Sequence, residues 1–386
     1  KDRRGAWVTF LLFLMTGIAI VVYLNQPPYQ VRERDYAYAG SFYAFAIWIG
    51  LGVAGLYAAL EARLKGKCGM VHTATAAAAG IVCLLAVPVV MAAENWDDHD
   101  RSNRKTAVEM AANYLNSVGK HGILVTHGDN DTFPLWYAQE VEGIRTDVRI
   151  CNTSLLGTEW HIDQMNYACN KSKPLKLSVG QSQYLYGTNE FVYIFEDENA
   201  DKPMPIKKVM EIFRNPAARQ TLSNGEKVNV ICSRSISIPV NKENILRHGI
   251  LDPKFEGLIP EAIVFTIPEN KRYITKPELF LLDLLSNYEW DRPIHLLSMG
   301  GDLNIGQKEW LMYDTFSFKL VPVKGSNSVH NPGFCDPYQM YDDMKNKYRW
   351  DALSKDDYFV DYQNIYTFIG VLPQRTLFIN LADKLL

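Results

Sequence analysis

The chain has 386 residues, a formal net charge of −3 and 47% hydrophobic residues. This balance excludes a disordered tail, a collagen-like repeat and a strongly basic nucleic-acid-binding protein, so no nucleic-acid partner is expected. Nearly all of the membrane-like sequence precedes Ala93, whereas the rest has the mixed composition of a water-soluble α/β protein.

The first part of the chain contains three windows that are long and apolar enough to cross a membrane. They lie at about 5–24, 39–60 and 70–93, and none contains Asp, Glu, Lys or Arg. A helix needs roughly 20 apolar residues to span a bilayer. The first window is not a signal peptide, because no small-residue cleavage site follows it and two more windows come after it. We therefore predict three transmembrane helices within residues 1–93.

Basic residues beside these windows predict the orientation of the protein. Short cytoplasmic loops carry an excess of Lys and Arg. Such residues cluster before the first window and between the second and third windows: Lys1, Arg3, Arg4, Arg63, Lys65 and Lys67. We therefore expect a membrane protein, in contact with lipid, whose residues 94–386 lie on the side opposite the cytoplasm. If the host is a double-membrane bacterium, this is a protein of the bacterial inner membrane and residues 94–386 are periplasmic.

Residues 94–335 predict a soluble α/β domain. After a helix that starts near residue 101, four elements follow one another with the spacing of a βαβ unit: a strand at 122–126, a turn at 127–131, a helix at 132–141 and a strand at 147–152. A capping box from Thr275 to Glu278 starts another helix, and the strand that follows at 294–298 should join the same sheet. We therefore expect a mainly parallel sheet.

The remaining soluble sequence is less regular. Residues 171–242 predict an insertion of mixed structure. Residues 336–386 predict a helical segment whose last helix, from about 365 to 386, has four candidate core anchors: Leu372, Phe378, Leu381 and Leu385. We expect this segment to lead into a helical array of the tetratricopeptide type.

Four cysteines lie in the soluble part, where a periplasmic location would permit disulfides. They are Cys151, Cys169, Cys232 and Cys335. Four cysteines allow three pairings, and the sequence does not choose among them. Buried free thiols are the alternative.

The first candidate site lies just before the second window. Arg32 and Arg34 could hold the phosphate of a membrane-anchored substrate, because guanidinium groups match phosphate oxygens in a bidentate manner. The alternative is an ordinary interfacial anchor in which these arginines pair with Glu33 and Asp35 while the neighbouring tyrosines lie in the headgroup layer.

The second candidate site follows the third window. Acidic residues and one histidine could bind a divalent cation or supply a general base, and the run comprises Asp97, Asp98, His99, Asp100 and Arg101. The alternative is a solvated junction in which Asp98 or Asp100 caps a helix. The two stretches expected on the side opposite the cytoplasm next to the membrane, which carry the first and second candidate sites, are therefore both polar.

The third candidate site lies at the carboxyl end of the strand at 122–126. Asp129, Asn130 and Asp131 could hold a metal ion and a diphosphate, and the start of the next helix attracts anions. Trp136 nearby, with Trp160, His161 and Asp163, would suit a surface on which a sugar stacks, and the same residues would equally suit a core. The alternative is that Asp131 or Thr132 only caps the helix.

Common catalytic signatures are absent from the sequence. It contains no Walker loop, dinucleotide fingerprint, Gly-x-Ser-x-Gly elbow or His-Glu-x-x-His motif. Their absence argues against an ATPase, a dehydrogenase, a common serine hydrolase and a zincin.

Three segments resemble the Bacteroidetes branch of the domain-of-unknown-function 2723 family. They are residues 27–38, which contain Arg-Glu-Arg-Asp-Tyr-Ala-Tyr, residues 95–101, which read Asn-Trp-Asp-Asp-His-Asp-Arg, and residues 130–139, which begin Asn-Asp-Thr-Phe-Pro. That family is grouped with glycosyltransferase family 117, which includes animal protein O-mannosyltransferases.

The resemblance implies transfer of a mannose-like sugar from a polyprenyl-phosphate donor to Ser or Thr of an exported acceptor protein. The family's acidic catalytic residue would lie upstream of Lys1, because the chain starts without Met and is expected to be a piece of a longer polypeptide. Arg32 and Arg34 would complete the donor site, and the soluble domain would hold the acceptor. No soluble cofactor is expected, and a divalent cation is the only candidate metal.

Two other classes of function stay open. The chain could be a non-enzymatic envelope scaffold whose soluble domain and helical tail bind partners. It could also be a periplasmic hydrolase in which Asp129 and Asp131 hold a metal with a further ligand. A glycosyltransferase should bring Arg32, Arg34 and the run from Asp97 to Asp100 together under a cavity that is open to lipid. A scaffold should leave these residues salt-bridged and closed, with an exposed apolar patch on the soluble domain.

Overall fold

The structure is a computed structural model that describes residues 3–26, 34–64, 69–100, 102, 104–195, 203–297, 303–325, 334–350, 354–356 and 371–386. These residues fall into two compact units. The first ends at Arg104 and the second begins at Lys105.

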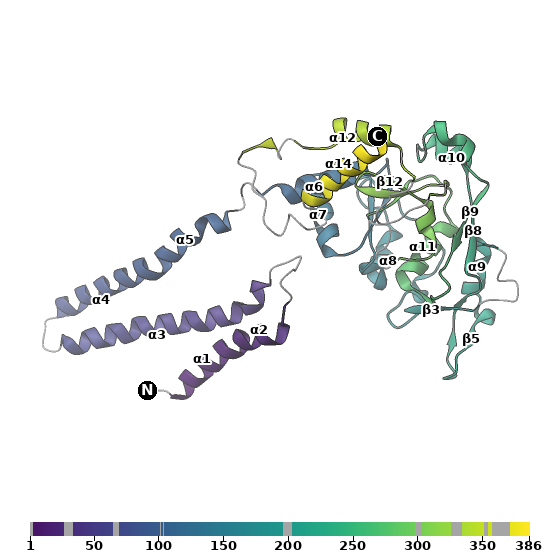
Figure 1. Ribbon diagram of the computed structural model, residues 1–386. Helices are drawn as coiled ribbons and strands as arrows, with labels where there is room; N and C mark the ends of the chain where they lie inside the picture. Colours follow the sequence, from purple (N-terminus) through teal and green to yellow (C-terminus); the bar gives the residue numbers. More distant parts are fainter. Residues whose placement is uncertain are drawn as a thin grey trace. The chain divides into compact units, whose positions relative to one another are not determined.

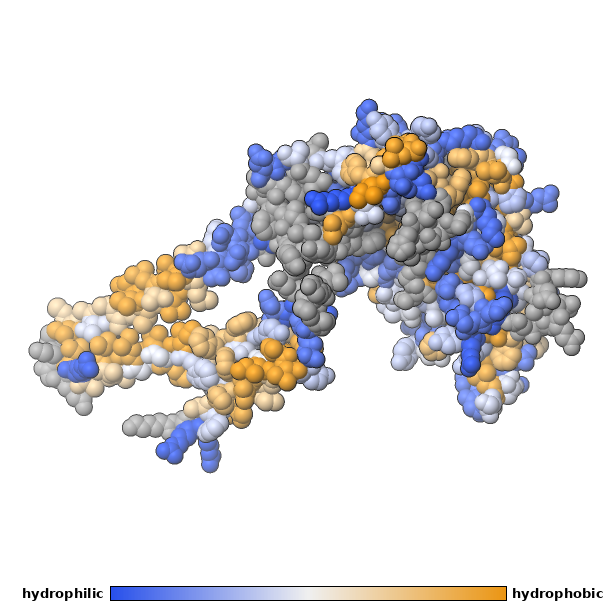
Figure 2. Space-filling view, viewed as in Figure 1, coloured by the Kyte–Doolittle hydropathy of each residue, from blue (hydrophilic) through white to orange (hydrophobic). Residues whose placement is uncertain are grey.

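The first unit confirms the three predicted membrane helices (Figure 1). The helical spans run over Arg3–Leu24, Asp35–Arg63 and Gly69–His99, and their apolar side chains are almost entirely unburied within the protein. Figure 2 shows these helices covered by hydrophobic residues. Exposing this much apolar surface to water is unfavourable, so the surfaces of these helices are suited to contact with lipid. The spans are built from α1 (Arg3–Thr16), α2 (Ile18–Leu24), η1 (Asp35–Tyr38), α3 (Ala39–Arg63), α4 (Gly69–Leu84), the π-helical turn η2 (Leu85–Val89) and α5 (Val90–His99).

Small residues let α1 and α3 approach closely. A Cβ atom on Gly17 would lie 2.5 Å from the Ser41 hydroxyl oxygen. Ser41 Oγ donates a hydrogen bond of 3.2 Å to the carbonyl oxygen of Phe13. Small residues and interhelical hydrogen bonds are the usual means of packing helices within a bilayer.

The second unit contains a five-stranded sheet with the order β12-β13-β11-β1-β2. β1 (Ile123–Thr126) lies between β2 (Arg149–Asn152) and β11 (Ile294–Leu296) and is parallel to both, which confirms the predicted βαβ unit and its extension. β12 (Leu311–Asp314) and β13 (Ser317–Leu320) form an antiparallel hairpin that pairs antiparallel with β11. The expectation of a mainly parallel sheet is therefore wrong. The sheet is mixed, because a tight hairpin returns the chain beside β11.

Helices cover both faces of this sheet. On one face α6 (Thr106–Ser117) and α7 (Asp129–Glu140) pack on Leu124 and Ile150. On the other face α8 (Glu159–Met165) and α11 (Lys276–Ser286) pack on Ile123, Val125 and Cys151. Successive strand residues point to opposite faces, so both faces of the central strands are apolar. The capping box predicted from Thr275 to Glu278 is present at the start of α11.

The other elements of the second unit form smaller sheets and short helices. The sheets have the orders β10-β3-β7, β4-β8-β9 and β5-β6. Their bounds are β3 (Phe191–Ile194), β4 (Met204–Pro205), α9 (Ile206–Arg214), β5 (Gln220–Thr221), β6 (Lys227–Val228), β7 (Val230–Ile231), β8 (Ser235–Pro239), α10 (Lys242–Arg247), β9 (Ala262–Thr266) and β10 (Tyr273–Thr275). The mixed insertion predicted over 171–242 is thus present, with most of its strands only two to five residues long.

Among the described residues after β13, two segments form helices of ten residues or more. α12 (Pro337–Asn346) and α14 (Val371–Leu385) pack on the same hydrophobic cluster as α6. Of the four expected anchors only Leu381 is buried, and Leu377 is the second buried anchor. Phe378 is 52% exposed.

The four soluble cysteines are free thiols. Cys151 is buried and Cys169 is exposed, while Cys232 and Cys335 are intermediate. The structure therefore favours free thiols over the three disulfide pairings.

Gly306 provides a test of the packing between β9 and the turn before β12. Its φ is +94°, and an added Cβ would lie 2.3 Å from the backbone nitrogen of Thr266. Gly306→Ala should therefore lower the free energy of unfolding by about 3 kcal/mol or more. Gly187 has a φ of +78° with open space around it, so Gly187→Ala should cost only about 1 kcal/mol. Urea unfolding of both variants in detergent measures the difference, and equal losses would contradict this packing.

Candidate functional site

The loop at the carboxyl end of β1 is closed by its own side chains. Asp131 is 7% exposed. Its carboxylate oxygens accept hydrogen bonds of 2.7 Å from the His127 amide and 2.8 Å from the Gly128 amide. Asn152 Nδ2 donates to the Gly128 carbonyl and to Thr132 Oγ1, which ties the loop to β2. The capping interpretation of Asp131 is thus confirmed.

The neighbouring residues do not complete a metal site with Asp131. Asp129 and Asn130 are exposed at the start of α7, and Asp129 Oδ1 accepts from the amide of Asn130. Within the part of the chain that the structure describes, no group of three His, Cys, Asp or Glu side chains converges to hold a metal ion. The metal-dependent hydrolase therefore lacks the convergence of ligands that it requires among these residues.

The polar residues next to the membrane helices belong to the first unit. Asp97, Asp98 and His99 are exposed on the last turn of α5, because this helix continues to His99. His99 Nδ1 lies 2.8 Å from the Asn95 carbonyl oxygen, and Asp100 accepts from the Ser102 amide. Arg34 and Asp35 lie at the start of the second span.

Arg32 and Arg101 lie outside the described residues. The joint donor site of Arg32, Arg34 and the acidic run therefore stays a prediction.

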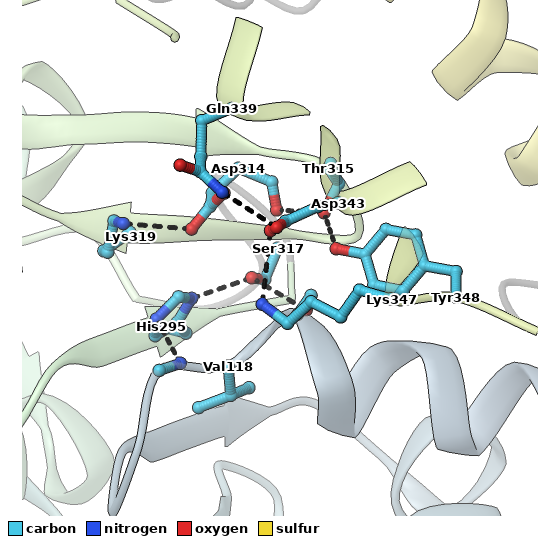
Figure 3. A network of polar contacts seen from close by, with 12 residues as sticks. Val118, His295, Asp314, Thr315, Ser317, Lys319, Gln339, Asp343, Lys347 and Tyr348 are labelled. Carbon is cyan, nitrogen blue, oxygen red and sulfur yellow. Dashed lines mark hydrogen bonds and ion pairs between the residues drawn. The ribbon is translucent and has the colours of Figure 1, made fainter. Parts of the chain in front are cut away.

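A charged cavity of about 320 Å³ lies at the amino ends of β1 and β11. Next to it His295, which is completely buried, links three elements (Figure 3). The Gly119 amide donates to His295 Nε2 at 3.3 Å, so in the neutral ring the proton is on Nδ1. This Nδ1 lies 2.8 Å from Ser317 Oγ, which in turn lies 3.3 Å from Ser117 Oγ.

This network holds the hairpin to the parallel strands and carries no free nucleophile. Ser117 Oγ donates to the Tyr114 carbonyl, so the hydroxyl proton of Ser317 is directed to Ser117 and His295 acts as the donor. The charged side chains drawn in Figure 3 are paired: Asp314 with Lys319 and Asp343 with Lys347, both at 3.2 Å. Because their charges are compensated internally, we assign them a structural role.

The second hollow of the domain is a groove of about 530 Å³ beside β2. We call it the β2 groove. Thr146, Val148, Arg149 and Ile150 form its floor. α7 contributes Trp136, Gln139 and Glu140 to one wall, and α8 with the loop after it forms the other wall. The second wall includes Trp160, His161, Gln164, Met165, Tyr167, Ala168, Cys169 and Asn170.

Aromatic rings from both walls line the β2 groove. Trp136 stacks on Phe133 at 5.4 Å between ring centroids, and Trp160 contacts His161 edge to face at 5.3 Å. Trp160 is 49% exposed and Tyr167 63% exposed. Half-exposed aromatic rings beside amide side chains are typical of binding surfaces for sugars and peptides.

His161 is the one residue of the groove with an unsatisfied buried atom among those described. The residue is 1% exposed, and its Nε2 accepts a hydrogen bond of 3.3 Å from the Asn152 amide. The neutral ring therefore carries its proton on Nδ1. This atom is buried without a hydrogen-bond partner. An unpaired buried donor costs roughly 1–3 kcal/mol.

Three of the four residues that the sequence suggested for a stacking surface, Trp136, Trp160 and His161, line this groove, and Asp163 does not. Their role in binding a sugar stays a prediction. The backbone floor and Tyr167 were not predicted, because only the order of the strands shows that β2 is an edge strand. Asp129 and Asn130 are not among the residues that line the groove.

The two buried histidines make the stability of the domain depend on pH. Burial lowers the pKa of His295 to about 3 and that of His161 to about 4. An unfolded histidine binds a proton near pH 6.5. Between these values the unfolded chain binds more protons than the folded chain. The free energy of unfolding therefore decreases as the pH is lowered, by about 1.4 kcal/mol per pH unit for each histidine.

Urea unfolding at pH 7.5 and pH 5 tests this dependence. His295→Asn should reduce the loss of stability between the two values, because asparagine does not titrate. His248 is exposed, and His248→Asn should leave the loss unchanged. An identical loss in all three proteins would contradict the role of His295.

Comparison with known families places the groove in a recognised domain. A family model described as TMEM260-associated domain 2 matches residues 107–337, which is more than half of the chain. The match covers the five-stranded sheet and the β2 groove. No curated protein and no solved structure matches the chain.

Proposed function

Because the chain belongs to the family defined by TMEM260-associated domain 2, we propose that it is part of a polytopic membrane glycosyltransferase. The enzyme would move a mannose-like sugar from a polyprenyl-phosphate donor to Ser or Thr of exported proteins. The resemblance to the domain-of-unknown-function 2723 family, which is grouped with glycosyltransferase family 117, supports the same proposal.

The β2 groove is the observation that carries this proposal. A transferase with a lipid-linked donor needs membrane helices for the donor and a separate surface for the acceptor protein. The chain has three helices able to span a membrane and, in the other unit, a groove with aromatic walls. The groove would therefore bind the acceptor.

The remaining roles follow from the resemblance. Arg32 and Arg34 would bind the donor phosphate, since guanidinium groups pair well with phosphate oxygens. The base that activates the acceptor hydroxyl would be the acidic catalytic residue that the resemblance implies. This arrangement requires residues 94–386 to lie on the periplasmic side of a bacterial inner membrane.

A scaffold is the second candidate function, and one observation favours it. α14 exposes Phe378 and Ile379, which are 52% and 67% exposed, and Tyr341 on α12 is 51% exposed. Exposed apolar residues of this size suit contact with another protein. A scaffold would use this face and would not consume a sugar donor.

A transfer assay with the full-length protein in membranes separates these functions. Polyprenyl-phosphate sugars are supplied together with an exported acceptor protein. Trp136→Ala plus Trp160→Ala should raise the KM for the acceptor by roughly tenfold or more, because two stacking surfaces are lost. The KM for the donor should not change.

Tyr186 provides the matched control for the aromatic substitutions. It is 94% exposed and does not line the groove, so Tyr186→Ala should leave both constants unchanged. If folded protein consumes no donor across a panel of sugars, the scaffold function takes the place of the enzyme.

A further inference from the structure

The outer edge of β2 is the floor of the β2 groove. β2 is the last strand of the sheet, with β1 on one side only. The Arg149 amide donates to the Gly122 carbonyl, and the Thr153 amide donates to the Thr126 carbonyl. Backbone groups of alternate residues point to the same side of a strand. The amide and carbonyl of Ile150 therefore point away from β1, into the groove.

The neighbouring outward groups on this edge are already occupied. The Val148 amide donates to the Arg145 carbonyl, and the Val148 carbonyl accepts 2.9 Å from Gln139 Nε2. The Asn152 amide donates to His161. Among the described residues, none makes a hydrogen bond to the outward amide or carbonyl of Ile150. The edge thus offers one open backbone position, flanked by two closed ones.

We propose that the β2 groove binds a short extended polypeptide segment, which adds to β2 as a sixth strand. This inference rests on the proposed function and names the form in which the acceptor is held: an unfolded segment rather than a folded surface. One residue of the segment lies opposite Ile150, accepts from its amide and donates to its carbonyl. This is the hydrogen-bonded pair of an antiparallel ladder.

The walls of the groove select the side chains of the segment. Ile150 points to the α7 side of the sheet and Cys151 to the α8 side. Side chains alternate along a strand, so the residue opposite Ile150 faces Trp136 and its two neighbours face Trp160 and His161. The exposed amide of Gln164 on this wall can donate to a hydroxyl or carbonyl oxygen, which suits a segment rich in Ser and Thr.

The open position at Ile150 sets the length of the bound segment. Of β2, only Arg149 and Ile150 line the floor, and Thr146 and Val148 precede the strand. An extended chain rises about 3.3 Å per residue, so a segment of about five residues extends two residues to each side of the one opposite Ile150. A sugar ring could stack on the tryptophans, but it has no groups at the spacing of an amide and a carbonyl of the same residue.

Cys169 gives a direct readout of occupancy. It is an exposed free thiol on the wall of the groove. The probe is a capped peptide of about ten residues with a central Val-Thr-Val-Ser-Val and lysines at both ends. Bound to the full chain in detergent, it should slow the maleimide labelling of Cys169 at least fivefold, measured by mass spectrometry for each cysteine. The same peptide with a methyl group on the central backbone nitrogens should not.

Two variants control for effects on folding. Ala168 is exposed and lines the groove, whereas Ala217 is exposed on the 3-10 turn after α9 and does not. Ala168→Trp fills the groove and should abolish protection by the peptide. Ala217→Trp adds the same side chain elsewhere and should keep it.

The outcomes separate this inference from the proposed function. Strand addition is overturned if the methylated peptide protects Cys169 as well as the unmodified one does. It is also overturned if mannose oligosaccharides protect Cys169 and the peptide does not. Neither result contradicts sugar transfer. Protection that requires the backbone N–H, in a protein that transfers no sugar, supports strand addition and overturns the transferase. Absence of protection by the unmodified peptide also overturns strand addition.

Discussion

The soluble unit depends on strand β1, which pairs with parallel strands on both sides and is buried on both faces. Its four residues, Ile123 to Thr126, are at most 3% exposed. A strand in this position must be covered by helices on each face, and the chain supplies α6 and α7 on one and α8 and α11 on the other. The backbone hydrogen bonds of β1 are satisfied by β2 and β11, so ligands meet the sheet only at its ends or edges.

Side chains hydrogen-bond the described loops at both ends of β1. At the amino ends the neutral ring of His295 joins Gly119 to Ser317, and the adjacent carboxylates are paired with lysines. At the carboxyl ends Asp131 occupies two loop amides. Ligands of open α/β sheets commonly bind at the carboxyl ends. Here the loop after β1 is closed by Asp131, and the aromatic groove lies beside β2.

The sequence predicted the elements better than their arrangement. Apolar windows identify the membrane helices because a bilayer sets both their length and their composition. The βαβ unit and the capping box at Thr275 are local patterns, and both are present. The β12–β13 hairpin was missed, and with it the mixed character of the sheet, because the strand order depends on contacts between distant residues.

The candidate site also depends on contacts between residues that are distant in the sequence. Trp136 and His161 lie 25 residues apart in the sequence, and their rings lie 6.3 Å apart because α7 and α8 flank the same edge strand. Residue types indicated a stacking surface. The role of Ile150 comes from its backbone and from its place at the edge, so no sequence motif could have shown it.

Amide hydrogen exchange at Ile150 in the full-length protein in membranes tests the central claim most directly. The account predicts that the Ile150 amide, which lacks a partner in the free protein, exchanges at least tenfold faster than that of Cys151, which faces β1. Addition of an acceptor protein should bring the two rates together. Equal and slow exchange of both amides in the free protein would contradict an open edge, and an unchanged Ile150 rate with the acceptor at saturation would contradict its role in binding.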